Sequence, residues 1–377
     1  MKYLNLFFYL TIIALLTLLL SCEENELSTK LKKADIVFDK TYDDVNARPQ
    51  RIVRNSNDEF FLYYWEYIIK VDENGNKLWA IKRNNKSLCP TKDGGCIIAY
   101  SNYLAKINSE GNIEWEKSGA NYELSEVIIG DNDEIYGVGD FEISSHVRKP
   151  KFYKYTKDGD YLSSRLLINV NGCQTLCMTK LKNNRLVIGT YNNISNEREN
   201  YDYNIIEFAI DGDSTVIERH YGGYKNDFIE NISETQDGGL ILVGYSKSKD
   251  GDVKSYRDEL SLVDGNGWVV KLDANREIMW EKLLGGTGWT YFYKTIYLNN
   301  NYFVGFQTGA TDVDFKGVEK PKSGFITFDE VGNILDSKYI GAEIVNCEFN
   351  SKGELLLLSS SVDEYYEIYK PRLVKMK

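Results

Sequence analysis

DGGLILVGY, at Asp237–Tyr245, is the stretch around which this sequence is organised, together with WVVKLDANREIMWEK at Trp268–Lys282. The second segment aligns without gaps to YLAKINSEGNIEWEK (Tyr103–Lys117) and to YIIKVDENGNKLWAI (Tyr67–Ile81). In each segment an apolar run is followed by a polar turn and a second run with a central tryptophan. This pattern predicts a β-hairpin.

The first segment is repeated as well. DGGCIIAY (Asp93–Tyr100) is its best copy, and looser copies lie at Asp58–Tyr64, Asn132–Gly139, Lys182–Gly189, Leu298–Gly305 and Lys352–Leu358. A further apolar run precedes each copy, so the unit has four short strands. Units of this kind, repeated along a chain, predict the blades of a β-propeller, because one such sheet cannot bury both of its faces alone.

The repeat count is seven, and the last copy is incomplete, since the chain ends after Arg372–Lys377. ADIVFDKTY (Ala34–Tyr42) supplies the missing outer strand, with Phe38 at the tryptophan position. We therefore predict an all-β, seven-bladed β-propeller of four-stranded antiparallel blades, closed when the N-terminal strand completes the last blade. Closure also removes sheet edges that would promote aggregation.

Tryptophan and lysine recur at fixed places in the unit. Trp79, Trp115 and Trp280 are equivalent, and so are Lys70, Lys106 and Lys271. A fixed position in a repeat is typical of a packing role, so we expect the three tryptophans to lie between neighbouring blades. We assign them to structure rather than to ligand binding.

The N-terminus predicts export. An apolar run from Tyr3 to Leu20 is followed by LLSC (Leu19–Cys22), which resembles the bacterial lipobox, in which the cysteine is lipidated. The predicted division is a lipoprotein signal peptide at 1–21, an acidic and polar tether at 22–33, and the propeller at 34–377. The alternative is an uncleaved N-terminal membrane anchor, because the run is long enough to span a bilayer.

The tether contains a candidate second targeting signal. Glu23-Glu24-Asn25-Glu26 resembles the acidic export tag that sends lipoproteins to the outer face of the outer membrane in one group of Gram-negative bacteria. We expect a lipid-anchored outer-membrane protein at the cell surface, with the periplasmic face as the alternative.

The net charge of the chain limits the classes of partner that it is expected to bind. The chain has 45 basic and 56 acidic residues, a net charge of −11, and loss of residues 1–21 removes only Lys2 and gives −12. An acidic surface repels nucleic acid and phospholipid headgroups. Apart from the membrane reached through the lipid, neutral glycans, proteins and divalent cations remain as candidate partners.

The blades differ in the connection between their second and third strands. Long polar inserts occur there at Tyr191–Tyr203, Ser246–Gly267 and Gln307–Gly324, in blades four to six, and a shorter one at Asp140–Pro150 in blade three. These connections share one face of a propeller, where long loops on a rigid scaffold commonly bind ligands. Tolerated surface variation is the alternative. The candidate ligand-binding residues are Tyr191, Tyr201, Tyr203, Tyr256, Asp312 and Asp314, with aromatic rings for stacking on sugars.

The sequence contains few residues or motifs that are typical of catalytic or metal sites. The only histidines are His146 and His220, and no catalytic motif, and hence no catalytic residue, is identified. Asp250-Gly251-Asp252 and Asp312-Val313-Asp314 space oxygens as cation loops do, so a Ca²⁺ site at Asp250 and Asp252 is a hypothesis, with a solvated acidic loop as the alternative. No other cofactor is expected. GGTGW (Gly285–Trp289) aligns with YGGYKND (Tyr221–Asp227) as a link between blades, which argues against a phosphate loop.

Cysteine leaves two interpretations open. With Cys22 lipidated, five cysteines remain: Cys89, Cys96, Cys173, Cys177 and Cys347. Cys89 and Cys96 flank a hairpin turn and a disulfide between them is one interpretation. The favoured one is that these cysteines are small buried hydrophobic residues inside the blades.

The whole unit at Asp237–Gly286 resembles a repeat of secreted and lipid-anchored bacterial β-propellers, with a T-x-DGG strand, an insert, and W-x-x-K-L-D-x-x-G-x-x-x-W. Arg276 stands where that pattern has glycine. The resemblance implies a fold and, only by analogy, an interaction platform. Three hypotheses follow: a non-catalytic binding module for glycan or protein at the insert-bearing face, a glycan-active or quinone-dependent enzyme, or a structural part of an outer-membrane assembly.

Overall fold

The structure, a computed structural model, describes residues 27, 30–100, 102–119, 124–144, 147–167, 174–193, 201–211, 216–317, 322–341, 343–362 and 369–376. Predictions about the signal segment 1–21, Cys22, His146, Cys173 and the side chain of Tyr191 lie outside the residues described in this way.

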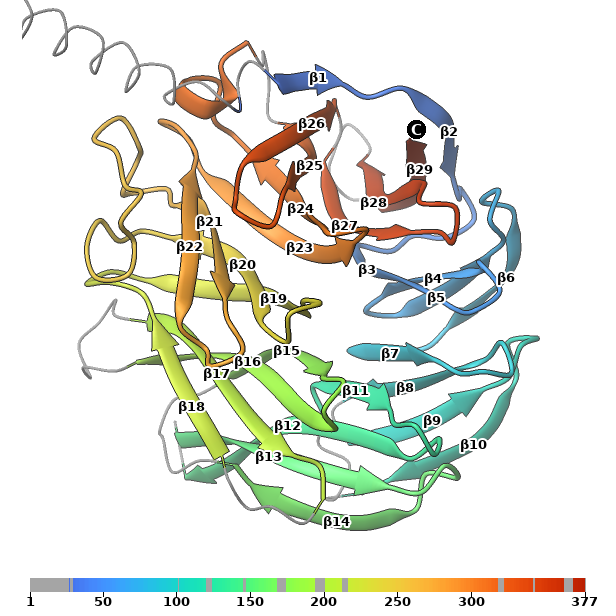
Figure 1. Ribbon diagram of the computed structural model, residues 1–377. Coiled ribbons are helices and arrows are strands. Elements are labelled where there is room, and N and C mark those ends of the chain that lie inside the picture. The colour runs from blue at the N-terminus through green and yellow to red at the C-terminus, as the bar shows by residue number, and fades with distance from the viewer. Residues whose placement is uncertain are drawn as a thin grey trace, which may run out of the picture.

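The described strands form seven sheets arranged around a central axis (Figure 1), and they are antiparallel except for one added edge strand. Each innermost strand contacts the innermost strand of the next sheet, and the last of them, β27, contacts the first, β3, so the ring is closed. The predicted seven-bladed β-propeller is therefore confirmed.

Blades one to four follow the chain in order. Their strands are, for blade one, β3 (Pro49–Arg54), β4 (Phe60–Tyr64), β5 (Tyr67–Val71) and β6 (Lys77–Lys82); for blade two, β7 (Ser87–Pro90), β8 (Cys96–Tyr100), β9 (Tyr103–Ile107) and β10 (Ile113–Ser118); for blade three, β11 (Glu126–Ile129), β12 (Ile135–Ser144), β13 (Val147–Tyr155) and β14 (Tyr161–Leu166); and for blade four, β15 (Gln174–Lys180), β16 (Arg185–Asn193), β17 (Tyr201–Ala209) and β18 (Val216–Tyr221).

The remaining blades include the N-terminal strands. Their strands are, for blade five, β19 (Asp227–Glu234), β20 (Leu240–Ser246), β21 (Asn266–Leu272) and β22 (Ile278–Leu284); for blade six, β23 (Thr290–Leu298), β24 (Asn301–Thr308), β25 (Lys322–Phe328), β26 (Ile334–Ile340) and the added β1 (Leu31–Lys33); and for blade seven, β27 (Ile344–Phe349), β28 (Leu355–Val362), β29 (Tyr369–Met376) and β2 (Ile36–Thr41). A short 3₁₀ helix, η1 (Val313–Phe315), follows β24.

The ring closes where the sequence predicts. β2 pairs antiparallel with β29, with Ile36 opposite Met376 and Thr41 opposite Arg372. The Arg372 guanidinium also donates to the Asp39 carboxylate across this pair, at 2.7 Å from Nε. This contact lowers the pKa of Asp39 below its ordinary value.

One strand is not predicted by the repeat. β1, at the end of the expected tether, adds to the outer edge of blade six and runs parallel to β26, with Leu31 opposite Ser337 and Lys33 opposite Tyr339. Because the two strands are parallel, Lys30 lies near the start of β26 and donates to the Ile334 carbonyl. The chain therefore approaches blade six from the side of the hairpin turns.

The tryptophans of blades one, two and five each pack against the next blade, as predicted. A Cβ at Gly111 of blade two would lie 3.0 Å from the Trp79 ring of blade one, and one at Gly332 of blade six would lie 2.9 Å from the Trp280 ring of blade five. Both glycines have a positive φ, +89° and +87°, which suits glycine in these tight turns. Trp280 Nε1 also donates to the Glu330 carbonyl at 2.9 Å.

The repeated lysines are buried, and each pairs with a more exposed carboxylate at the end of its own blade. Lys106 Nζ lies 2.7 Å from the Asp93 carboxylate and Lys271 Nζ lies 2.8 Å from Asp237, so the aspartate of DGG is the partner of the lysine on the third strand. In blade one a glutamate two positions later, Glu59, takes this role for Lys70 at 2.6 Å. The lysine that recurs in the sequence thus corresponds to an ion pair that recurs in otherwise apolar sheets.

Blades four and five depart from the repeat together. Blade four has Glu207 at the lysine position, and blade five has Arg276 at the glycine position, with a φ of +72°. Arg276 Nε donates to Glu207 at 2.7 Å between side chains that are only 4% and 5% exposed, and Arg185 donates to the same carboxylate at 2.8 Å. The two substitutions compensate each other across the blade boundary.

The predicted insert of blade three is mainly an extended hairpin, and the described ends of the blade-four insert are paired strands. In blade three Asp140–Pro150 is paired strand, with Asp140 opposite Pro150 and Ser144 opposite Val147. In blade four the pairing continues to Asn193 opposite Tyr201. The interpretation of the blade-three segment as a loop was wrong, because its strands continue beyond the body of the blade. Residues 194–200 of the blade-four insert lie outside the described residues. Long loops remain in blades five and six.

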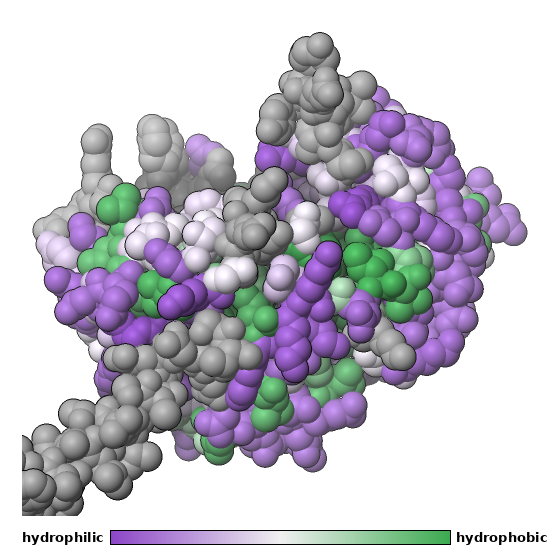
Figure 2. Space-filling view, turned by 90° about the horizontal axis from the view of Figure 1, so that it is seen from above, coloured by the Kyte–Doolittle hydropathy of each residue, from purple (hydrophilic) through white to green (hydrophobic). Residues whose placement is uncertain are grey.

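The surface is largely polar. Figure 2 shows hydrophobic residues in separate small groups between hydrophilic ones. Among the residues that the structure describes, none belongs to a helix long and apolar enough to cross a membrane.

Candidate functional site

The loops of blades five and six are fixed to the links between blades by the same set of hydrogen bonds. Asp252 and Gly222 exchange two bonds, from Gly222 N to Oδ2 at 3.2 Å and from Asp252 N to the Gly222 carbonyl at 2.8 Å. Asp314 and Gly285 do the same, at 2.9 and 3.2 Å. We call these contacts the loop latches.

The first aspartate of each pair completes its latch. Asp250 Oδ1 accepts from Tyr224 N at 2.7 Å, and Asp312 Oδ1 accepts from Thr287 N at 2.9 Å. A Cβ on Gly286, the glycine enclosed by the second latch, would overlap Asp312. The paired glycines of the links are thus needed for the close approach of the carboxylates.

The latches explain the Asp-x-Asp spacing without a cation, since the carboxylates of Asp250, Asp252, Asp312 and Asp314 accept hydrogen bonds from the blade links. Asp314 is 4% exposed and pairs with Arg257. Within the described ranges, no group of three or more His, Cys, Asp or Glu residues is arranged to hold a metal ion. The Ca²⁺ site at Asp250 and Asp252 remains a hypothesis.

The predicted aromatic residues divide into different environments. Tyr203 is fully buried, packs on Trp268 with ring centroids 4.6 Å apart, and donates to the Trp268 carbonyl at 3.1 Å. It therefore contributes to the core rather than to a surface. Tyr256 is half-buried against the core of blades four and five. Tyr201 is half-buried at the end of its strand on the insert-bearing face.

Tyr201 belongs to a continuous band of aromatic rings that the sequence analysis did not find. Successive centroids are 5.5 Å apart from Tyr201 to Phe228, 5.1 Å to Tyr245, 4.7 Å to Tyr291 and 5.3 Å to Trp289. We call these five residues the aromatic band. All are half-buried, and together they cross from blade four through blade five to blade six.

The band lies on the insert-bearing face. Phe228 and Tyr291 are at the starts of their innermost strands, and Tyr245 is at the end of a second strand, which is where links and inserts meet. Three of the five come from ordinary strand positions, so only the arrangement of the blades brings them together.

Two carboxyl groups lie next to the band in sequence. A Cβ on Gly222 would be 2.7 Å from Asp202 Oδ1 and 2.6 Å from Asp227 Oδ2, so both groups face the same small space. Burial raises the pKa of Asp202 to about 7, with repulsion from Asp227 and Asp252 adding to it. Burial likewise raises the pKa of Asp227 to about 6, against the effect of donors such as Ser246.

The axial channel is a second polar feature, with a cavity of about 410 Å³. Arg51 pairs with Glu126 inside it and donates to the Leu176 carbonyl at 3.0 Å. Glu230 lines the channel, at a β-bulge between Ile229 and Asn231. Because protein surrounds the channel, desolvation raises the pKa of Glu230 to about 7. Bulges of this kind redirect side chains toward such openings.

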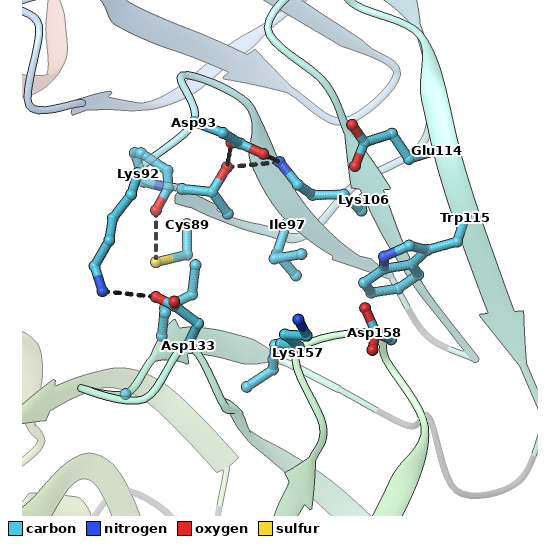
Figure 3. Close-up of a pocket in the computed structure, with 15 residues that line it drawn as sticks. Cys89, Lys92, Asp93, Ile97, Lys106, Glu114, Trp115, Asp133, Lys157 and Asp158 are labelled. Carbon is cyan, nitrogen blue, oxygen red and sulfur yellow. Dashed lines mark hydrogen bonds and ion pairs between the residues drawn. The ribbon is translucent and has the colours of Figure 1, made fainter.

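A pocket lies between blades two and three, on the hairpin-turn face (Figure 3). Its volume is about 480 Å³, within the usual range for ligand sites. Trp115 forms one wall, Ile97 and Ile135 line the interior, and the paired Lys106 and Asp93 lie at one edge. Trp115 therefore packs against the next blade, as predicted, and also borders a pocket that the repeat alone does not reveal.

Of the cysteines that the structure describes, Cys96, Cys177 and Cys347 are buried, as the favoured interpretation expects, and Cys89 is half-buried. Cys89 and Cys96 are free, and their register places Cys89 opposite Ile97 and Cys96 opposite Pro90, so the alternative of a disulfide between them was wrong. Cys177 and Cys347 are buried and free. Burial raises the pKa of the Cys89 thiol to about 11, which disfavours the reactive thiolate.

Comparison with known proteins defines the fold alone. No family model and no curated protein matches the sequence. Among solved structures, the chain is similar to YCF48 bound to D1 peptide (TM-score 0.56, 10% identity, 92% of this chain and 97% of that one) and to the Neurospora crassa Pan2 WD40 domain (0.56, 12%, 88% and 89%). It is also similar to virginiamycin B lyase from Staphylococcus aureus (0.54, 13%, 90% and 99%). A peptide-bound protein and a lyase thus share this architecture, so the comparison shows the β-propeller fold and does not show an activity.

Proposed function

We propose that this protein is a non-catalytic binding module, anchored to the cell envelope by a lipid on Cys22, that holds neutral glycan chains on its insert-bearing face. The aromatic band carries the proposal. Tyrosine and tryptophan rings combine apolar area with a polar group, which suits the faces and hydroxyl groups of sugars. A row of such rings across three blades offers a linear glycan several successive contacts.

Charge favours neutral sugars over acidic ones. Asp264 and Glu230 are close enough to Tyr291 to contribute, after burial, to raising the pKa of its phenol. These carboxylates and the overall charge of −11 would repel uronic acids, sulfated glycans and phospholipid headgroups.

Rigidity supports the proposal as well. The loop latches hold the inserts of blades five and six against the links from which the band begins. A surface that is already ordered loses less conformational entropy when a ligand binds.

The N-terminal strand gives the anchored protein an orientation. Lys30 lies on the hairpin-turn side of blade six. Lys30 is eight residues after Cys22, and that length of chain can span at most about 29 Å. A lipid on Cys22 would keep the hairpin-turn face toward the membrane, and the insert-bearing face would point outward to the glycan.

A glycan-cleaving enzyme would use two carboxyl groups across a sugar, and Asp202 with Asp227 is the nearest pair to the band. Asp227 is fully buried, however, and accepts from Gly223 N at 2.8 Å and Ser248 Oγ at 2.9 Å. It has no route to a glycosidic bond in this arrangement. This observation favours binding over cleavage.

The test is binding of the full-length protein in detergent to an array of neutral and uronic-acid-containing glycans. We expect binding to neutral chains, at least tenfold weaker for Tyr245→Ala and retained for Tyr245→Phe, which keeps the ring. Tyr161→Ala, at an exposed tyrosine on the outer strand of blade three, is the matched control. No binding by the wild type, or equal binding by Tyr245→Ala, would refute the proposal.

The anchor is tested separately. Metabolic labelling with a fatty acid is expected to mark the wild type and not Cys22→Ala. Protease added to intact cells should cleave a cell-surface protein and spare a periplasmic one.

A further inference from the structure

The pocket between blades two and three is distinct from the aromatic band and lies on the opposite face of the propeller. It is formed by the hairpin turns of both blades, with Lys92 and Asp133 paired across it at 2.8 Å. Figure 3 shows Trp115, Ile97 and Asp158 around the same opening. The proposed glycan surface does not use it.

Comparison of equivalent positions explains why the space is open. Between blades five and six, the positions of Ile129 and Ile135 are occupied by Tyr297 and Tyr302, which are paired across their hairpin in the same way. Tyr302 packs against Trp280, the counterpart of Trp115, with centroids 5.8 Å apart. Two tyrosine rings thus fill the space that two isoleucines leave open.

The charges at the opening are of two kinds. Lys92 with Asp133 and Lys106 with Asp93 are paired with each other. Within the described part of the chain, three charged residues of the lining take part in no ion pair and are exposed: Glu114 and Asp158, on either side of Trp115, and Lys157 beside Asp158. An aromatic wall flanked by two carboxylates is a favourable place for a cation, through both ion pairing and cation–π attraction.

We propose that this pocket binds a segment of a protein partner in which an aliphatic or aromatic side chain is next to lysine or arginine. The apolar side chain enters between Ile97, Ile129 and Ile135. The neighbouring basic side chain lies over Trp115 and pairs with Glu114 or Asp158.

The chemistry of the opening selects this partner. The unpaired carboxylates Glu114 and Asp158 outnumber the unpaired Lys157, so the opening disfavours phospholipid headgroups and nucleic acids, which are negatively charged. A glycan would contact one tryptophan and leave the apolar interior empty. An apolar residue beside a basic one satisfies both parts of the site, and buried anchors of this kind carry most of the affinity in protein interfaces.

The probes are fluorescent decapeptides with a central Leu-Arg or Phe-Arg pair in glycine–serine flanks, and matched peptides with Glu in place of Arg. Fluorescence anisotropy with the full-length protein in detergent measures their dissociation constants. We expect the Arg peptides to bind at least tenfold more tightly than the Glu peptides.

Two sets of variants separate the parts of the pocket. Ile129→Tyr, alone and with Ile135→Tyr, introduces the residues that fill the equivalent space between blades five and six, and is expected to weaken the Arg peptides at least tenfold without lowering Tm. Glu114→Gln with Asp158→Asn should remove the preference for Arg over Glu. Met279→Gln, at the Glu114 position of blade five, is the matched control and should change neither property.

Each outcome decides the proposal. Equal binding of Arg and Glu peptides, wild-type binding by the filled variants, or no binding of any peptide overturns it. Tyr245→Ala should leave peptide binding unchanged, so the failure of the glycan proposal and the failure of this one are distinguishable. If glycans compete with the peptides, the two surfaces are not separate and the assignment is wrong.

Discussion

Replacing Arg276 with glycine separates what the repeat predicts from what the structure predicts. Glycine is the usual residue at this turn, and Arg276 has a φ of +72°. A non-glycine residue in the left-handed region costs roughly 1–2 kcal/mol, so the repeat alone predicts that Arg276→Gly stabilises the protein.

The structure predicts the opposite sign. Arg276 is 4% exposed and donates to Glu207, which is itself buried, and to the Gly238 carbonyl at 2.9 Å. Breaking a buried ion pair costs roughly 3–5 kcal/mol. Since Glu207 keeps Arg185, the loss is expected at the lower end of that range. After the relief of backbone strain, Arg276→Gly should destabilise the protein by about 2 kcal/mol.

The assay is equilibrium unfolding in urea at 25 °C, read by tryptophan fluorescence, for the wild type, Arg276→Gly, Glu207→Gln and the double variant. The contact between the two side chains predicts a coupling energy of roughly 1–3 kcal/mol in this cycle. An Arg276→Gly protein as stable as the wild type, or more stable, would refute the reasoning. Additive single substitutions would show that the ion pair contributes nothing.

Three further predictions concern other parts of the propeller. Asp312→Ala opens one loop latch, so limited proteolysis should cut the blade-six insert at least several-fold faster than in wild type. The free energy of unfolding should fall as pH rises from about 4 to about 7. The pKa values of Asp202 and Asp227 are raised in the folded state, so that state keeps protons that the unfolded state has released. Asp227→Asn should flatten this pH dependence, measured by urea titration. Gly332→Ala would place a methyl group 2.9 Å from the Trp280 ring at a φ of +87°, and a loss of about 2 kcal/mol or more is expected in the same assay.

Each of these has a contrary result. Equal proteolysis of Asp312→Ala and wild type would mean that the insert is held by other contacts. A stability that rises over the same pH range would show that the two carboxyl groups are charged in the folded state. Unchanged stability of Gly332→Ala would contradict the close approach of the tryptophan.

The choice of aromatic site residues shows where sequence reasoning failed. Tyr203 is an aromatic residue in a polar insert, which is why it was selected as a ligand-binding candidate. Its ring is nevertheless buried against Trp268. Tyr245 and Tyr291 lie in ordinary strands and were not selected, although they are central to the aromatic band. No local pattern distinguishes these cases, because side-chain exposure at a strand end depends on the neighbouring blade.

The Asp-x-Asp motifs show a related limit. Their spacing is shared by cation loops and by loops that hydrogen-bond to backbone amides. Asp252 and Asp314 make the same two contacts to a glycine in the preceding link, and that link is some thirty residues earlier in the chain. The glycine pairs that begin at Gly222 and Gly285 recur in the links between blades. Together with the Asp-x-Asp motifs, they were the sequence signal that could have predicted the latches.

The sequence by itself determined the propeller, the number of blades and the closure by β2, because four-strand units with a fixed tryptophan and a fixed lysine recur and each unit must bury its faces against a copy. Local composition also identified the long loops of blades five and six, although it did not show that the blade-three insert is a paired hairpin. Only the tertiary structure decided the aromatic band, the latches, the Arg276–Glu207 pair and the open pocket beside Trp115. These features join residues of adjacent blades, and whether such residues meet depends on the sizes and charges of side chains far apart in the chain.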